Sequence, residues 1–225
     1  MSFFVLIKFK FLFQVNNAGI GGANLDGDAL RASATAAERT GAAKINWDLV
    51  KIDQTYELAL ECLQTNYFGT KRMTEAFIPL LKSSKSPRIL NVSSARGKLQ
   101  KITNEWAKGI LSDVDNLTEE RVDEVVDEFL KDFKEGSLES KGWPSSYSAY
   151  IVSKVALNAY TRIVAKEQPN MKVNCICPGN VRTDINLHTG ILSVEEGAEV
   201  IVKLALLPDD CPSGLFFIRE EVSVF

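Results

Sequence analysis

The sequence predicts an α/β protein built on a doubly wound parallel β-sheet. Short apolar or β-branched runs alternate with longer segments in which apolar residues recur at helical spacing. Each predicted strand except the first is preceded by Pro, Gly or Asn. The chain has 225 residues, of which 45% are hydrophobic and 24% are charged, so it can bury a substantial core. We therefore expect one domain.

Four strands are expected, at residues 9–15, 88–93, 172–177 and 215–218. The first belongs to an apolar stretch, residues 3–13, that also resembles the core of a signal peptide. Lys8 and Lys10 interrupt this stretch, and it is too short to span a bilayer. We therefore interpret it as a buried strand preceded by extra residues and expect no association with a membrane.

Helices are expected at residues 54–81, 118–133, 148–165 and 193–206. Gly69 marks a point where the first helix can be interrupted, and Pro79 lies in its last turn. The last helix starts with Ser193 and Glu196 at the spacing of a capping box, in which each side chain bonds a main-chain amide near the helix start.

Residues 97–143 form a charged segment that departs from this alternation. Within it, residues 118–133 place apolar side chains, including Val122 and Phe129, on one stripe of a helix. Thr118 is suited to cap this helix. Two interpretations remain open: the stripe packs onto the domain, which we favour, or it binds a partner.

Charge and cysteine content exclude several classes of function. The net charge is −3 and there is no basic stripe, so nucleic acid is not an expected partner. The four cysteines form no CxxC pair, and His188 is the single histidine. We therefore expect neither a metal site nor disulfides, and a reducing, cytoplasmic location.

Tyr150 and Lys154 lie four residues apart on a predicted helix and share one face. At this spacing an ammonium can lower the pKa of a phenol and make it a proton donor. Reduction of a carbonyl needs such a group, because the arriving hydride leaves negative charge on oxygen. The pair alone is weak evidence, since this spacing is common in helices.

Three predicted strands end in residues that strengthen this interpretation. Ser94 follows the second strand and could hold a carbonyl oxygen, while Ser93 is interpreted as structural. Asn17-Ala18-Gly19 and Pro178-Gly179 follow the first and third strands. Because ligands of open α/β folds bind at the carboxyl edge of the sheet, these segments are expected to meet at one site.

Five motifs in this order resemble those of the short-chain dehydrogenase/reductase superfamily: NNAG, the Asn66 of QTNYFGT, NVSS, YSAYIVSK and CPGNVRTD. The resemblance covers residues 12–225. The insertion, the GWPSS tract and the SVEEGAE and ALLP segments are similar to the monomeric carbonyl-reductase branch, which includes plant neomenthol and menthone dehydrogenases and salutaridine reductase.

The resemblance implies a Rossmann-type fold and an NADP(H)-dependent carbonyl reductase or alcohol dehydrogenase acting on a small apolar, terpenoid- or alkaloid-like substrate. The implied catalytic residues are Tyr150 as general acid, Lys154 as the residue that lowers its pKa and binds the nicotinamide ribose, Ser94 as the carbonyl-binding residue and Asn66 in a proton relay. The implied cofactor-binding residues are Asn17, Ala18, Gly19, Tyr150, Lys154, Pro178, Gly179, Val181 and Thr183. The insertion implies a monomer, because it covers the face through which other members dimerise.

The sequence departs from the family pattern at its start. No GxxxGxG or GxGxxG turn, which would receive the pyrophosphate at a helix N-terminus, occurs in the chain. We therefore expect one incomplete, N-terminally truncated domain over residues 1–225 that lacks its first βα units, with residues 97–143 as a helical insertion.

The alternative to an active reductase is a truncated, catalytically inactive family member that cannot bind the dinucleotide. The substrate pocket is expected to be shaped by residues 97–106 and 186–192.

Overall fold

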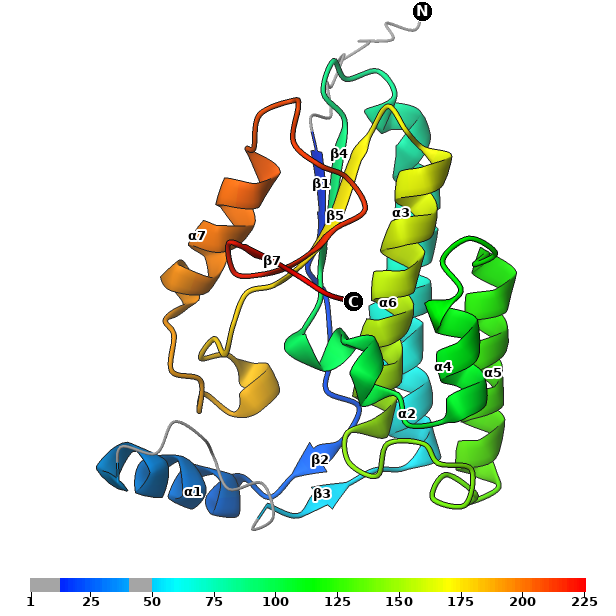
Figure 1. Ribbon diagram of the computed structural model, residues 1–225. Helices are drawn as coiled ribbons and strands as arrows, with labels where there is room; N and C mark the ends of the chain where they lie inside the picture. Colours follow the sequence, from blue (N-terminus) through cyan, green and yellow to red (C-terminus); the bar gives the residue numbers. More distant parts are fainter. Residues whose placement is uncertain (1–12, 41–49) are drawn as a thin grey trace, which may run out of the picture.

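A computed structural model describes residues 13–40 and 50–225 and has a central five-stranded sheet (Figure 1). The strands are ordered β1 (Phe13–Asn16), β4 (Arg88–Val92), β5 (Lys172–Cys177), β6 (Phe216–Ile218) and β7 (Glu221–Ser223). The first four run parallel, and β7 pairs antiparallel with β6. The predicted doubly wound α/β architecture is confirmed.

Helices cover both faces of this sheet. On one side lies a continuous helical rod of α2 (Tyr56–Leu63), the π-helical segment η2 (Gln64–Gly69) and α3 (Thr70–Leu81), together with α6 (Ser148–Glu167). On the other side lies α7 (Val194–Ala205). Outside α6, α5 (Glu119–Lys134) and α4 (Glu105–Ser112) add a further layer.

The side chains on the two faces of the central strands belong to two separate hydrophobic clusters. Ile89 of β4 packs in the cluster formed with α2, α5 and α6, whereas Leu90 and Val92 pack with Val200 and Leu204 of α7. Successive side chains of a strand point to opposite faces, so a strand covered on both sides is buried throughout, and β4 buries the polar Arg88 and Asn91 as well as its apolar residues. This is why residues 88–92 are all buried.

The predicted strands and helices are largely confirmed. Strand β5 has the expected bounds, β4 and β6 differ by one residue at one end, and β1 ends one residue later than expected. Residues 9–12 of the first predicted strand lie outside the described residues. The helical rod changes geometry at Gly69, as expected, and the predicted capping box of Ser193 and Glu196 is present.

The position of helix α5 decides between the two interpretations of its apolar stripe: the stripe packs onto the domain, as favoured, and is not open to a partner. Thr118 caps it, and its apolar stripe is buried against α2 and α6. Val122 and Phe129 have no exposed surface. A partner cannot engage these side chains, so the stripe packs onto the domain.

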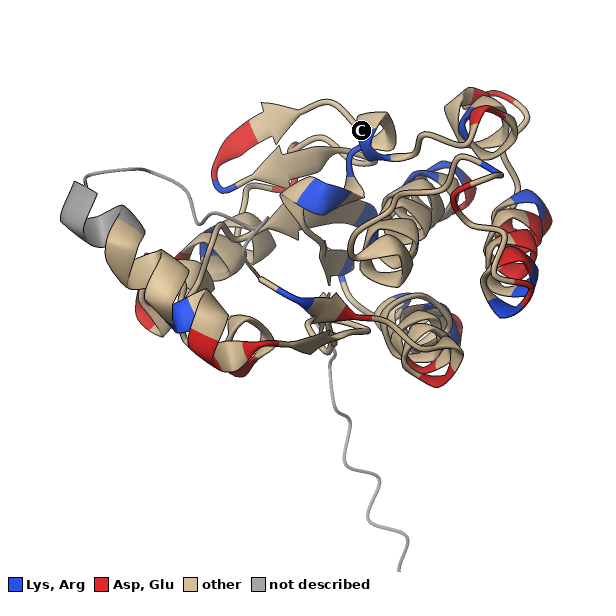
Figure 2. Cartoon of the chain, turned by 90° about the horizontal axis from the view of Figure 1, so that it is seen from below, with Lys and Arg blue, Asp and Glu red and all other residues tan. Residues whose placement is uncertain are grey.

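Several elements were not predicted. They are α1 (Gly27–Thr40), the short strands β2 (Asn24–Leu25) and β3 (Ile52–Asp53), α4, β7, and the 3-10 turns at Ala95–Gly97, Leu99–Lys101 and Asp184–Asn186. Acidic and basic residues both occur among the helices of the described chain (Figure 2). In α5 and α7, acidic residues occupy the first turn and lysines lie in the last, as the helix dipole favours.

Candidate active site

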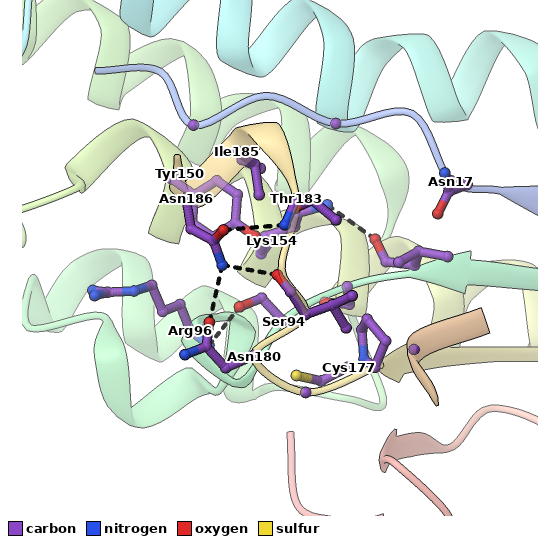
Figure 3. A pocket seen from close by; sticks show the side chains of 18 of the residues that line it. Asn17, Ser94, Arg96, Tyr150, Lys154, Cys177, Asn180, Thr183, Ile185 and Asn186 are labelled. Carbon is purple, nitrogen blue, oxygen red and sulfur yellow. Dashed lines mark hydrogen bonds between the residues drawn. The ribbon is translucent and has the colours of Figure 1, made fainter. Parts of the chain in front are cut away.

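A cavity of about 660 Å³ opens at the carboxyl ends of β1, β4 and β5. These strand ends contribute residues of the 17–21, 92–96 and 177–186 segments, while α7 supplies Val194, Gly197 and Ile201 from the opposite side. Tyr150 and Lys154 of α6 also line it (Figure 3). Tyr147, which precedes α6, is a further lining residue. The carboxyl edge of a parallel sheet is where open α/β folds bind ligands, so this cavity is the candidate active site.

Lys154 is held at the base of the cavity by the packing of α6. Nearly every side chain of α6 between residues 148 and 164 is buried, and Lys154 is only 3% exposed. Its Nζ donates a hydrogen bond of 2.9 Å to the carbonyl oxygen of Val92 at the end of β4. Burial disfavours the ammonium and lowers the pKa of Lys154 to about 8.

Tyr150 stands one helical turn before Lys154, with 5.7 Å between its ring centroid and Lys154 Nζ. Burial raises the pKa of Tyr150 to about 12, although a hydrogen bond with Ser94 and the positive charge of Arg96 act in the opposite direction. The net shift therefore differs from the lowering expected from sequence, because desolvation of the phenolate outweighs the nearby positive charge. Tyr150 keeps its proton across the physiological pH range.

The two adjacent serines after β4 have different surroundings. Ser93 is 4% exposed and donates a hydrogen bond of 2.6 Å to Asn158 Oδ1, in keeping with its structural interpretation. Ser94 is half-buried, lines the cavity and contacts Tyr150. Because successive side chains of a strand point in opposite directions, the Ser93 hydroxyl faces the core and the Ser94 hydroxyl faces the cavity.

Asn66 lies behind the cavity wall, on the π-helical segment. Its Oδ1 accepts a hydrogen bond of 2.8 Å from the main-chain N–H of Ile20, and its Nδ2 donates to the Ile20 carbonyl oxygen and to Ser153 Oγ, both at 3.0 Å. This bonding fixes the turn after β1. A β-carbon at Gly19 would stand 3.3 Å from Asn66 Oδ1 and 3.4 Å from Lys154 Nζ.

The segment after β5 forms the wall opposite α6. Gly179 has φ +98°, and a β-carbon there would lie 2.6 Å from Leu192, so a side chain would be both strained and crowded. Asn186 fastens the rest of the segment. Its Nδ2 donates to Asn180 Oδ1 at 3.0 Å and to the Val181 carbonyl oxygen at 2.8 Å, and its Oδ1 accepts from the Thr183 N–H at 3.2 Å (Figure 3).

The structure brings most of the predicted site residues together. The cavity is lined by Ser94, Tyr150, Lys154, Asn17, Ala18, Gly19, Pro178, Gly179, Val181 and Thr183. Asn66 does not line the cavity, but it bonds to Ile20, next to the lining residue Gly19. Tyr147 also lines the cavity.

The expected contribution of residues 97–106 is wrong. Gly97 packs into the interior, where a β-carbon would stand 2.9 Å from Asn158, from Ser93 and from the Lys154 carbonyl oxygen. Of residues 186–192, Asn186 is the one that lines the cavity. Arg96, Asn180 and Ile185 line it without having been predicted. Arg96 could have been found, because it lies two residues after Ser94.

All four cysteines are buried free thiols. Cys177 lines the cavity, and burial raises the pKa of Cys62, behind it, to about 11, so its thiol stays protonated. Within the part of the chain that the structure describes, no helix has the length and apolar character needed to cross a membrane.

Comparison with known proteins places the chain in a family. No protein-family model matches it. The protein named (+)-neomenthol dehydrogenase of Arabidopsis thaliana is 56% identical over 224 residues, which are 99% of this chain and 73% of that protein. Short-chain dehydrogenase/reductase 1 of Saponaria officinalis is 55% identical over 223 residues, or 99% of this chain and 72% of that protein. The chain belongs to the short-chain dehydrogenase/reductase family.

A solved structure of this family shows the same fold. Salutaridine reductase from Papaver somniferum is 49% identical and superimposes with a TM-score of 0.85, covering 93% of this chain and 72% of that protein. The human protein named carbonyl reductase [NADPH] 1 is 35% identical over 170 residues, or 71% of this chain and 59% of that protein. By family, this short-chain dehydrogenase/reductase is an oxidoreductase.

Proposed function

We propose that the chain is an NADP(H)-dependent carbonyl reductase that transfers hydride reversibly between the cofactor and a ketone or secondary alcohol on a small, largely apolar substrate. The observation that carries this proposal is the convergence of Ser94, Tyr150 and Lys154 on one cavity at the carboxyl edge of the sheet. NADP(H) is supported by the family resemblance of the motifs and by the name of the human carbonyl reductase.

The residues present fit the nicotinamide end of such a cofactor. Gly19 leaves open the space beside the Lys154 ammonium that any side chain would fill, because a β-carbon there would lie 3.4 Å from Nζ. Lys154 and the cavity-lining residues Asn17, Ala18, Pro178, Gly179, Val181 and Thr183 surround this space. In our proposal these residues hold the cofactor, and Lys154 binds its ribose.

In the proposed mechanism, the bound cofactor supplies hydride to the carbonyl carbon. Tyr150 donates its phenolic proton to the carbonyl oxygen, and Ser94 orients that oxygen by donating a hydrogen bond to it. Lys154 offsets the negative charge left on Tyr150. Because the pKa of Tyr150 is about 12, the phenol is protonated at neutral pH, as reduction requires.

For Asn66 we propose a positioning role in addition to the proton relay that the resemblance implies. The sequence resemblance implies a proton relay. Both ends of its side-chain amide bond to Ile20 and Ser153. This supports a positioning role, in which Asn66 holds the Gly19–Ile20 turn beside Lys154, where the cofactor ribose would bind.

The substrate proposed is a terpenoid- or alkaloid-like ketone. The names of the Arabidopsis and Papaver relatives refer to neomenthol and salutaridine. Ile185, Val194 and Ile201 give the cavity an apolar side suited to such a skeleton. We also propose that the chain is a monomer, because α5 and α4 cover the outer side of α6. Sedimentation at micromolar concentration tests this, and a stable dimer would contradict it.

NADPH binding to the purified chain tests the proposal first. Cofactor fluorescence and the melting temperature should both report saturable binding, since a ligand of the folded state raises its stability. Gly19→Val should abolish binding by filling the space beside Lys154. Gly109→Ala is the matched control, because nothing lies within 4 Å of a β-carbon there.

The second candidate function, a catalytically silent chain, rests on the lack of a glycine-rich phosphate turn in the sequence. A folded chain that binds no NADPH and reduces no ketone would favour it. Binding that Gly19→Val removes and Gly109→Ala retains, together with turnover of a ketone, would exclude it.

A further inference from the structure

Helix α5 supplies no residue to the cavity lining, yet one of its carboxylates bonds to the helical rod that carries Asn66. Asp123 is half-buried, and its two oxygens accept hydrogen bonds from different residues. The Tyr67 hydroxyl donates to Oδ1 at 2.6 Å, and Lys71 Nζ donates to Oδ2 at 2.8 Å. Glu119 of α5 also pairs with Lys71, at 3.0 Å. Asp123 thereby connects the insertion to the rod.

The two donors lie on opposite sides of the point where the rod changes geometry. Tyr67 belongs to the π-helical segment η2, and Lys71 belongs to the first turn of α3. A single carboxylate bonded to both donors holds these two turns at a fixed rotation relative to each other. The junction is also tightly packed, because a β-carbon at Gly69 would stand 3.0 Å from the Gln64 carbonyl oxygen. π-Helical turns are rare and are frequently found at functional sites.

Tyr67 can transmit this constraint to Asn66, the residue before it. Tyr67 has no exposed surface, and its ring packs edge to face against Tyr160 of α6, with 6.3 Å between the centroids. Burial, followed by the bond to Asp123, raises the pKa of Tyr67 above its ordinary value, so its hydroxyl stays protonated and donates. A rotation of the segment that broke the Tyr67 bond would also carry the Asn66 amide away from Ile20.

We propose that Asp123 is a positioning residue for the cofactor site, acting through Tyr67 and Asn66. Its carboxylate fixes the rotation of the π-helical segment, and Asn66 passes this constraint to the turn after β1 through its bonds to both main-chain groups of Ile20. The inference rests on the function proposed above, because this turn borders the space proposed for the ribose. Helix α5 thus acts on the affinity for NADP(H) without contacting the cofactor.

The dissociation constant of NADPH, measured for three variants, tests this inference. Asp123→Leu keeps the approximate volume of the side chain and removes both oxygens. Asp123→Asn keeps an acceptor for Tyr67 and removes the charge beside Lys71. Asp132→Asn is the matched control, because Asp132 is a buried carboxylate of the same helix that accepts a hydrogen bond from Trp143 Nε1 instead, at 2.8 Å.

The expected result is a loss of affinity that depends on the acceptor for Tyr67. Asp123→Leu should raise the dissociation constant about five- to thirtyfold, as for the loss of a hydrogen bond to a charged group. Asp123→Asn should remain within about threefold of wild type, because the amide oxygen restores the acceptor. Asp132→Asn should lower the melting temperature and leave the dissociation constant unchanged. An unchanged value in Asp123→Leu, or an equal loss in the control, would overturn the inference.

Tyr67→Phe tests the second step of the path and keeps the ring in its packing. It should raise the dissociation constant about three- to tenfold, and this variant carries the test if Asp123→Leu does not fold. Combining Tyr67→Phe with Asp123→Leu should weaken binding no more than Asp123→Leu alone, because residues that act through one bond are not additive. Losses that add would show that Asp123 acts by another route, and would overturn the path.

Hydrogen exchange at the Ile20 amide separates this inference from the proposed function, because it needs no cofactor. Asn66 Oδ1 accepts from this amide at 2.8 Å, so its protection reports the orientation of Asn66. Faster exchange in Asp123→Leu and Tyr67→Phe, but not in Asp132→Asn, would support the inference; in a chain that binds no NADPH, it would do so while the proposed function failed. Unchanged exchange in a chain that binds NADPH would overturn the inference and leave the function standing.

Discussion

Two walls of the same cavity are built in opposite ways. On the α6 side, Tyr150 and Lys154 belong to a helix buried along almost its whole length. On the other side, residues 178–192 are half-buried or exposed except for Gly190, and Asn186 holds them through bonds to three neighbours. Leu187 and His188 adopt positive φ there. The comparison teaches that packing in the core fixes the position of the proposed proton donor, whereas a few hydrogen bonds of one exposed-loop side chain fix the opposite wall.

The largest effect is expected on the buried wall. Tyr150→Phe removes the proposed proton donor and leaves the packing of α6 intact, so turnover should fall by about 10²–10⁴-fold. Steady-state NADPH oxidation measures this loss, and thermal unfolding should show a melting temperature within about 2 °C of wild type. A variant that keeps near-full rate would remove Tyr150 from the mechanism.

The adjacent serines sharpen the comparison within one strand end. Ser94→Ala removes a donor to the carbonyl oxygen and should cost about 10²-fold in kcat with little change in stability. Ser93→Ala leaves Asn158 Oδ1 buried without this donor and should cost about 1–3 kcal/mol in the free energy of unfolding, with kcat retained. Denaturant unfolding and kinetics on both variants check this, and exchanged phenotypes would refute the assignment.

The buried ammonium of Lys154 lowers the free energy of unfolding by an amount that depends on pH. Its pKa falls from 10.5 when unfolded to about 8 when folded, so the penalty of burying the ammonium is complete below pH 8 and disappears as pH rises toward 10.5. Lys154→Met should therefore be more stable than wild type at pH 7, by about 1–3 kcal/mol, and this advantage should shrink by pH 10. Urea unfolding at both pH values measures it. A constant difference would indicate that the titration of Lys154 does not contribute.

The smallest effect is expected on the exposed wall. Asn186→Ala removes the bonds to Asn180, Val181 and Thr183, and should raise KM by about three- to tenfold with kcat and melting temperature nearly unchanged. Asn116→Ala is a suitable control, since Asn116 makes comparable exposed side-chain bonds far from the cavity. A loss confined to kcat would show that this segment acts on the chemical step, and the comparison of the two walls would fail.

The sequence predicted the buried wall better than the exposed one. Strands β4 and β5 and helix α6 were found because extensive burial leaves segments dominated by apolar residues, and Ser94, Tyr150 and Lys154 occupy fixed offsets from them. Along residues 178–192, the shape depends on positive φ at Leu187 and His188, which no side-chain pattern indicates. Asn180 was missed for this reason, and of the segment 186–192 that was expected to shape the pocket, Asn186 lines it.

The elements that were not predicted share a weak pattern of apolar residues in the sequence. Helix α1 is rich in Ala, and Leu30 is its one fully buried large apolar side chain among the described ones, so no stripe forms. Strands β2 and β3 have two residues each, too few for an alternating pattern. Gly69 indicated an interruption of the first predicted helix, but no residue of Gln64–Gly69 indicated that the interruption is a π-helical segment.

That π-helical segment makes the site sensitive to insertions and deletions. Each residue of an α-helix turns the chain by about 100°, and a π-helical turn holds extra chain. Losing one residue between Gln64 and Gly69 would rotate Asn66 away from Ile20 or α3 away from the sheet, with every side chain chemically unchanged. The length of this segment is therefore as much a part of the site as the amide it carries.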